Sequence, residues 1–251
     1  MLRSLTKRGW RDHVASLRKK ASAGDVAAIT DLGVTFLEGI QGRNGQSIVR
    51  RNPRAAVALL HQAATGGDTA AASSLGYAYD TGLGTKPSVK KAIRWYRRAV
   101  RGGSSTAATN LATIHRDAGN SRLAFQWWKR SEEMCDGDAA VDVGYCYQYG
   151  IGTRKDATNA RRMFRRAIAS RNISQYGREE AMYHLAVQFI DEGKLRLALP
   201  LLKRASADDD FPEAASLVNQ IKTKSDYVPC RCKRFINKKL RGHTKCVLHT
   251  R

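Results

Sequence analysis

Apolar residues recur with a helical spacing at five places along the chain. Each copy starts with an alanine, followed by leucine or valine four residues later, glycine or alanine next, and an aromatic residue or histidine three residues after that. Because steps of four, one and three residues keep side chains on one face of a helix, each copy predicts an amphipathic helix. The copies start at Ala28, Ala71, Ala107, Ala139 and Ala181. We name these five segments the A helices.

A second apolar pattern follows each A helix. It consists of an alanine, two large apolar residues three and four positions later, and a small residue three positions after those. The copies start at Ala56, Ala92, Ala124, Ala160 and Ala198, and we name these segments the B helices. The A helices recur every 32 to 43 residues. A pair of such helices cannot bury its apolar face alone, so the pattern predicts an all-α fold, an α-solenoid of about five stacked hairpins.

Glycines mark the turn between the A and B helices of the second and fourth copies. The phrases "GYAYDTGLGT" (76–85) and "GYCYQYGIGT" (144–153) are nearly the same. A phosphate-binding loop would place its glycines after a strand and before a helix, whereas these follow a helix. We therefore expect Gly82, Gly84, Gly150 and Gly152 to adopt positive φ angles at the end of the A helix. The first copy replaces this turn with a longer basic insert, "GIQGRNGQSIVRRNP".

The second copy, "SLGYAYDTGLGTKPSVKKAIRWYRRAVRGG" (74–103), resembles the Sel1-like repeat, a relative of the tetratricopeptide repeats. The fourth copy is close to it, and the resemblance covers about residues 24–207. It implies a right-handed superhelix of hairpins that serves as a scaffold for protein–protein contact, with the A helices lining the concave face. In the secreted, cysteine-rich members a cysteine pair bridges the helices of each repeat. Cys135 and Cys146 have no such partners, so that subclass does not apply.

The side of each A helix opposite its buried stripe is the predicted partner-binding surface. At about 100° per residue, the positions one before and two after the buried leucine or valine point away from the core. Tyrosines at two of these positions favour recognition, because they supply rigid contact area with a hydroxyl group. The alternative is a solvated face without a ligand. The predicted partner-binding residues are Asp31, Ser74, Tyr77, Asn110, Asp142, Tyr145 and His184.

The chain is strongly basic, with 44 Lys and Arg against 22 Asp and Glu and a net charge of +22. This balance favours an acidic protein surface or nucleic acid as partner. Basic pairs also recur in the B helices and predict a weak, non-specific anion-binding ridge, with a merely solvated face as the alternative. The main pairs of this ridge are Arg97, Arg98, Arg165 and Arg166.

The C-terminal segment 223–251 combines cysteine, histidine and basic residues. Cys230 and Cys232, then Cys246 and His249, form two closely spaced pairs that predict a structural Cys₃His zinc site. His243 is an alternative ligand, and a disordered tail with unligated thiols is the alternative to a zinc site. Basic residues here extend the predicted anion-binding set: Arg231, Lys233, Arg234, Lys238 and Lys239.

These patterns divide the chain into a basic N-terminal helix (1–23), five repeats with a capping helix (24–222) and the tail (223–251). No catalytic constellation or small-molecule site is evident, and no run of 18 apolar residues suggests a membrane span. The Arg-rich start also suits an organellar transit peptide, although the cysteine pattern favours the cytoplasm. We expect a non-enzymatic adaptor that binds a protein partner. The alternative is a nucleic-acid-associated protein that uses its basic ends and tail.

Overall fold

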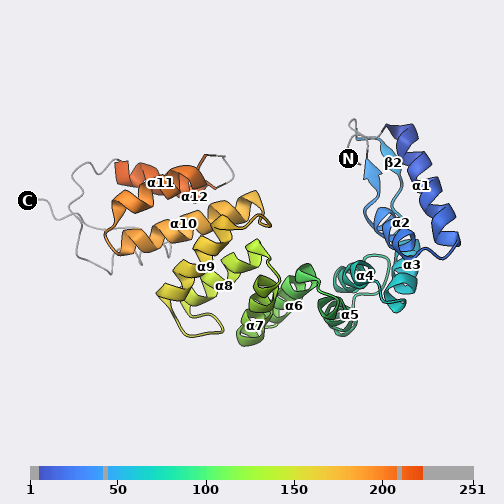
Figure 1. Cartoon of the computed structure of the whole chain (residues 1–251), viewed down its shortest axis with the longest axis horizontal. Coiled ribbons are helices and arrows are strands. Elements are labelled where there is room, and N and C mark those ends of the chain that lie inside the picture. Colours follow the sequence, from blue (N-terminus) through green and yellow to red (C-terminus); the bar gives the residue numbers. More distant parts are fainter. Residues whose placement is uncertain (1–5, 42–44, 208–210, 223–251) are drawn as a thin grey trace, which may run out of the picture. The chain divides into compact units, whose positions relative to one another are not determined.

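The computed structural model describes residues 6–41, 45–207 and 211–222. The chain divides into two compact units, residues 1–135 and 136–251. The described part of the first unit contains seven helices and two short strands (Figure 1). They are α1 (Lys7–Ser22), α2 (Val26–Glu38), β1 (Ile40–Gln41), β2 (Ser47–Val49), α3 (Pro53–Thr65), α4 (Thr69–Thr81), α5 (Val89–Arg101), α6 (Ser105–Asp117) and α7 (Ser121–Glu133).

The described part of the second unit contains five helices. They are α8 (Gly137–Tyr149), α9 (Ala157–Ala169), α10 (Gln175–Asp191), α11 (Leu195–Ala205) and α12 (Pro212–Lys222). The predicted A helices are α2, α4, α6, α8 and α10, and the predicted B helices are α3, α5, α7, α9 and α11. The α-solenoid prediction is therefore confirmed at the level of five helical hairpins, and the predicted capping helix is α12.

Side-chain caps mark the starts of most of the described helices, with α7 and α11 as exceptions. A side-chain oxygen of the residue before the helix accepts a hydrogen bond from the backbone amide three residues later, which satisfies a donor that has no partner within the helix. In α4, for example, Asp68 Oδ1 accepts from the Ala71 amide at 2.6 Å. The same cap recurs at Asp25, Asn52, Ser88, Ser104, Asp136, Asp156 and Ser174.

One backbone hydrogen bond is common to all five hairpins. The amide of the residue before each B helix donates to the carbonyl of the aromatic residue or histidine in the preceding A helix, at 2.7–2.8 Å. This bond fixes the approach of the B helix although the intervening turns differ in length. The donor–acceptor pairs are Asn52–Phe36, Ser88–Tyr79, Asn120–His115, Asp156–Tyr147 and Lys194–Phe189.

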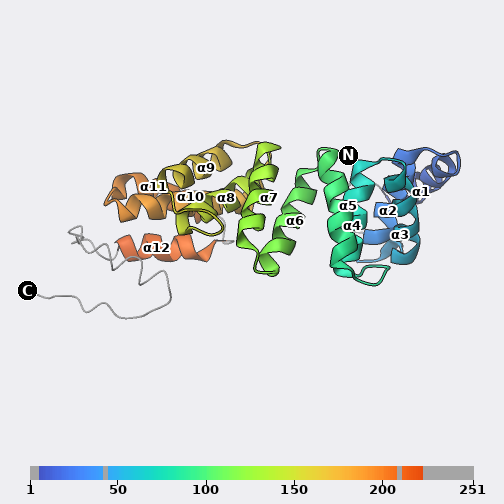
Figure 2. The same cartoon turned by 90° about the horizontal axis from the view of Figure 1, so that it is seen from below.

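Successive hairpins of the first unit pack on one another through small residues. The helices α2 to α5 lie side by side (Figure 2), and their buried alanines and leucines form one core with α6. Glycine at the A-helix position next to the buried leucine lets the B helix approach closely. A Cβ at Gly76 would lie 2.6 Å from Cδ1 of Tyr96, which fills that space.

The insert of the first hairpin differs from the all-α prediction. It forms a two-stranded antiparallel ribbon in which Ile40 pairs with Val49, and α1 packs against β2. The predicted turn glycines do behave as expected, since Gly82, Gly84, Gly150 and Gly152 all have φ between +68° and +77°.

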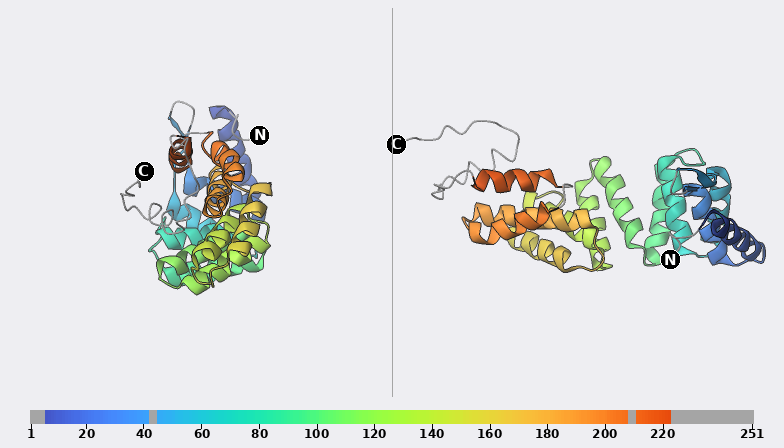
Figure 3. Two further views of the ribbon diagram at one scale, coloured as in Figure 1. Left: turned by 90° about the vertical axis from the view of Figure 1, so that its left-hand side faces the viewer. Right: turned by 90° about the horizontal axis from the view of Figure 1, so that it is seen from above.

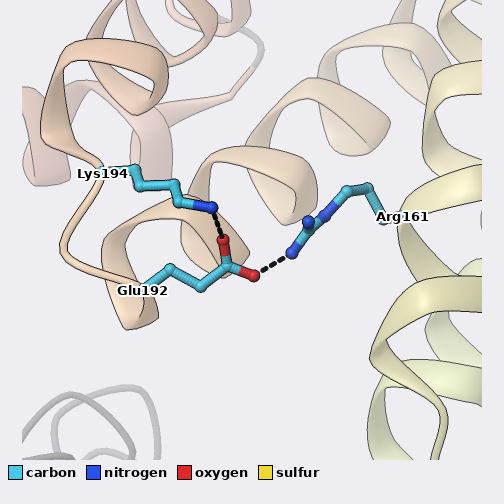
Figure 4. A network of polar contacts seen from close by, with 3 residues as sticks. All are labelled: Arg161, Glu192 and Lys194. Carbon is cyan, nitrogen blue, oxygen red and sulfur yellow. Dashed lines mark hydrogen bonds and ion pairs between the residues drawn. The ribbon is translucent and has the colours of Figure 1, made fainter.

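The fifth hairpin is tied to the fourth by a polar network (Figure 4). The Glu192 carboxylate, just beyond the end of α10, pairs with Arg161 of α9 and, at 2.8 Å, with Lys194 before α11. The hydrogen bond from Lys194, together with Arg161, holds the pKa of Glu192 below its ordinary value. Beyond this hairpin, α12 packs on α11 (Figure 3). None of the helices in the described part of the chain combines the length and apolar character that crossing a bilayer requires.

Candidate functional site

Two exposed tyrosines lie one turn apart on α8 in the second unit. Tyr145 and Tyr149 are 40% and 44% exposed, and their ring centroids are 4.5 Å apart. The His184 ring of α10 lies 5.4 Å from the Tyr145 ring and 6.3 Å from the Tyr149 ring. Neighbouring A helices therefore present one aromatic cluster, with a surface formed by the tyrosines.

His184 differs from its prediction as an exposed partner-binding residue. It is only 7% exposed, and its ring stacks on Phe164 of α9 at 5.3 Å between centroids. The reason is that α10 packs against α8, α9 and α11, which enclose this position. His184 thus supports the tyrosines from below, and its Nε2 lies 3.8 Å from a carboxylate oxygen of Glu180.

Polar and charged groups lie close to the tyrosine pair. Burial, together with Tyr145, Tyr183 and Asp191, raises the pKa of Tyr149 from 10.0 to about 12. Burial also raises the pKa of Asp191, while Lys155 acts in the opposite direction.

Gln188, one turn after His184 on α10, is a polar side chain within the core of the second unit. Among the described residues, neither its side-chain nitrogen nor its oxygen has a hydrogen-bond partner, although buried amides normally find one.

The first unit carries a related arrangement on α4 and α6. Tyr77 is 46% exposed, and Asp80 follows it by three residues on the same helix. Burial raises the pKa of Asp80, and the carboxylate of Asp117 on α6 raises it further. Two like charges are therefore close enough to interact, and Arg116 of α6 pairs with the Asp117 carboxylate at 2.9 Å.

The seven predicted partner-binding residues are divided between the units. Asp31 is exposed, Ser74 and Asn110 are half-buried, and Tyr77 is exposed in the first unit. The second unit contains the other three, which lie on α8 and α10: Asp142, Tyr145 and His184. The predictions that Tyr77 and Tyr145 are exposed, and that Tyr79 and Tyr147 pack against the cores, are confirmed.

The prediction missed residues one or two turns further along the same helices. Tyr149 follows Tyr145 by four residues, Asp80 follows Tyr77 by three, and Asp191 follows His184 by seven. All three intervals keep residues on one helix face, so extending the predicted series by one turn, or by two in α10, would have found them.

The model of the Sel1 repeat matches residues 26–68, 69–104, 107–134 and 137–172. These segments cover more than half of the chain. The chain belongs to the Sel1 repeat family. The four matches correspond to the first four predicted hairpins. The fifth hairpin of this Sel1 repeat protein, α10 and α11, lies beyond residue 172 but shares the hydrogen bond that closes the others.

Solved structures share the fold. A Sel1 repeat protein from Oxalobacter formigenes superposes with a TM-score of 0.62 at 22% identity, covering 84% of this chain and 88% of that one. A protective antigen present in uropathogenic Escherichia coli strains, which displays an SLR fold, gives a TM-score of 0.59 at 20% identity. That match covers 84% of this chain and 52% of the antigen. A sequence search of curated proteins found no match.

Charge is segregated by helix type in this Sel1 repeat protein. The five A helices contain nine acidic residues and two basic ones, whereas the five B helices contain seventeen basic residues and two acidic ones. The net charge of +22 therefore does not describe the A helices, which are acidic.

The predicted anion-binding ridge consists of residues in different environments. Arg97, Arg165 and Arg166 are exposed. Arg98 is half-buried and donates a hydrogen bond of 3.0 Å to the Thr65 carbonyl at the end of α3. Arg98 therefore has a structural role, because its side chain satisfies a carbonyl at the C-terminal end of α3 that has no partner within the helix.

The predicted zinc ligands Cys230, Cys232, Cys246 and His249 lie outside the described residues, and so do the predicted anion-binding residues of the tail. Within the described ranges, no three His, Cys, Asp or Glu side chains are grouped as a metal site would need. The zinc site therefore stays a prediction.

Proposed function

We propose that this Sel1 repeat protein is a non-enzymatic adaptor that binds a protein partner through the outward faces of its A helices. Sel1 repeat proteins commonly act as scaffolds for protein interaction. The main observation behind binding through the A helices is the pair of exposed tyrosines, Tyr145 and Tyr149, which contact the buried ring of His184.

The tyrosine pair has the properties of an interaction anchor. Each ring offers a large apolar area and loses little conformational entropy on binding, because packing already restricts it. His184 and Phe164 support the pair from the core side. Two unrelated, solvated tyrosines would not be expected to contact the same buried ring. The shared contact with His184 therefore favours a role in recognition.

The charge of the A helices indicates the chemistry of the partner. Asp142 and Asp191 lie on the helices that carry the aromatic cluster, and in the first unit Asp80 follows Tyr77 on α4 and interacts with Asp117 of α6. A lysine or arginine side chain can pair with these carboxylates and also lie against a tyrosine ring. We therefore propose a cationic segment as the ligand of the A helices. The acidic partner predicted from the total charge fits the B helices instead.

The test compares a double variant with a control in the same unit. Partners are captured from a lysate of the source organism, after nuclease treatment and at moderate salt, and the captured protein is then purified and titrated against the variants. Tyr145→Ala/Tyr149→Ala should lower the affinity by about tenfold or more, because each anchor contributes about 1–2 kcal/mol. Leu197→Ala removes a 51% exposed side chain from α11 and should leave the affinity unchanged.

The possible results separate the two functions. Wild-type affinity of the tyrosine double variant would show that the A helices of the second unit do not bind the partner. Retention on nucleic acid that is lost when residues 223–251 are removed, with no protein captured, would support the nucleic-acid alternative.

A further inference from the structure

A basic groove lies between the N-terminal helix and the insert of the first hairpin. Its cavity of about 910 Å³ is bordered by α1, the end of α2, and β2 with the residues that follow it. Four arginines line it, two from α1 (Arg11 and Arg18) and two that follow β2 (Arg50 and Arg51). None of these residues belongs to the partner-binding surface of the A helices.

The local structure explains why the four arginines converge. Arg11 and Arg18 are seven residues apart on α1, so they share one helix face, and Val14 lies between them. Across the groove, Arg51 Nε donates a hydrogen bond of 3.0 Å to the Leu37 carbonyl at the end of α2. The chain after β2 is therefore fixed in place, and it brings Arg50 to the same groove.

Positive charge in the groove is not balanced locally. The charged side chains lining it are all arginines, and in the described part of the chain none of the four forms an ion pair. Guanidinium groups gathered in this way repel one another. An anion that binds between them relieves this repulsion and is attracted by all four charges. Their planar donors also match the geometry of a carboxylate.

We propose that this groove binds an acidic segment of a protein, in which carboxylates alternate with aliphatic side chains. The aliphatic part is indicated by Val14, Ile48 and Val49, which line the cavity between the arginines. The volume suits a few residues of a peptide, since ligand pockets typically measure about 300–1,000 Å³.

Single-stranded nucleic acid fits the same groove less well. Base recognition of that kind depends on aromatic rings on which bases stack. The aromatic side chain of the lining is Phe36, and the Arg18 guanidinium lies over its ring at 5.7 Å from the centroid. That ring face is therefore already covered, and the remaining apolar lining is aliphatic.

The test uses the full chain and a short fluorescent peptide of alternating glutamate and leucine, at near-physiological salt. Arg18→Gln/Arg50→Gln should bind it at least about tenfold more weakly than the wild type, because two charge-assisted contacts are lost. The matched control Lys19→Gln/Lys20→Gln removes the same charge from exposed positions on α1 that do not line the cavity, and it should bind within about twofold of the wild type. Circular dichroism checks that both variants keep their helices.

A second comparison tests the aliphatic contribution. Ile48→Ser should weaken binding of the glutamate–leucine peptide but not of a glutamate–glycine peptide of the same length. Failure of the wild type to bind the first peptide, or equal loss in the lysine control, would overturn the proposal. So would tighter binding of a single-stranded oligonucleotide of equal charge that is lost in the arginine variant. Tyr145→Ala/Tyr149→Ala should leave peptide binding unchanged, which keeps this result separate from the function proposed for the A helices.

Discussion

Gly144 of α8 faces the ring of Phe164 of α9 so closely that no side chain fits between them. A Cβ at position 144 would lie 2.6 Å from Cε1 of Phe164. Gly76 stands in the same relation to Tyr96 in the first unit. The absent side chain on the A helix therefore sets the distance between the two helices of these hairpins, and in the second unit it also lets Phe164 reach His184.

Gly144→Ala should destabilise the second unit by up to about 2 kcal/mol. Alanine is the better helix former by about 1 kcal/mol, but overpacking of a dense core typically costs about 1–3 kcal/mol and outweighs that gain. Urea denaturation followed by circular dichroism measures the difference.

A double-mutant cycle identifies the source of that loss. Phe164→Leu alone leaves a cavity and should also destabilise the unit. Combined with Gly144→Ala, it should cost clearly less than the sum of the two single changes, because the shorter side chain makes room for the new methyl group. Strict additivity would show that the ring contact is not the cause.

The helices and their buried faces were predictable because the repeating pattern of small and large residues specifies them locally. The same holds for the turns, where Gly82 and Gly150 adopt the positive φ angles expected of them. The ribbon in the first insert was not predictable from its own sequence. Its two strands span only Ile40–Gln41 and Ser47–Val49, and α1, from another part of the chain, packs against it.

The partner-binding residues were predictable only where exposure depends on the helix itself. Tyr77 and Tyr145 are exposed as expected. His184 stands at the other predicted position, one residue before the buried Leu185, but it is buried, because α10 is enclosed by neighbouring helices that periodicity along one segment does not reveal. Total charge does not describe the A helices for a similar reason, since the excess of basic residues belongs to the B helices and the ends.

Cys135→Gly should stabilise the protein by up to about 1 kcal/mol. Cys135 has a φ of +66° and directly precedes a helix-capping residue, a place that Gly24, Gly67 and Gly103 occupy before other A helices, also with positive φ. A residue with a Cβ pays about 1–2 kcal/mol in this conformation, and the greater chain entropy of unfolded glycine offsets part of the gain. The control is Cys135→Ala, which removes the sulfur but keeps the Cβ and should give no such increase in the denaturation midpoint.

Zinc should copurify with the full chain in a ratio of about one ion per molecule, if the four ligands predicted in residues 223–251 act together. Elemental analysis after gentle purification measures the ratio. Cys246→Ser/His249→Ala should abolish it, whereas Cys135→Ser, a change outside the predicted site, should not. A ratio below about 0.3 in the wild type would contradict the prediction.

The second unit should lose stability as the pH rises from about 9 toward 12. Burial, together with the nearby Asp142 carboxylate, raises the pKa of the Cys146 thiol from its ordinary value of 9.0 to about 12. In this range the thiol ionises in the unfolded chain but stays protonated in the folded one. Ionisation therefore stabilises the unfolded state but not the folded state, and the free energy of unfolding falls.

Between pH 8 and pH 10 the loss attributable to this thiol should be about 1.4 kcal/mol, the value for one group that ionises only on unfolding. Cys146→Ala lowers stability at every pH, because it removes buried volume. It should also make the free energy of unfolding depend less on pH in this interval. Urea denaturation of both proteins across the interval measures the difference in slope. The interval ends at pH 10 because Tyr149, whose pKa is raised from 10.0 to about 12, adds a loss of the same sign above it. Equal slopes for the two proteins would show that the Cys146 thiol does not resist ionisation in the folded chain.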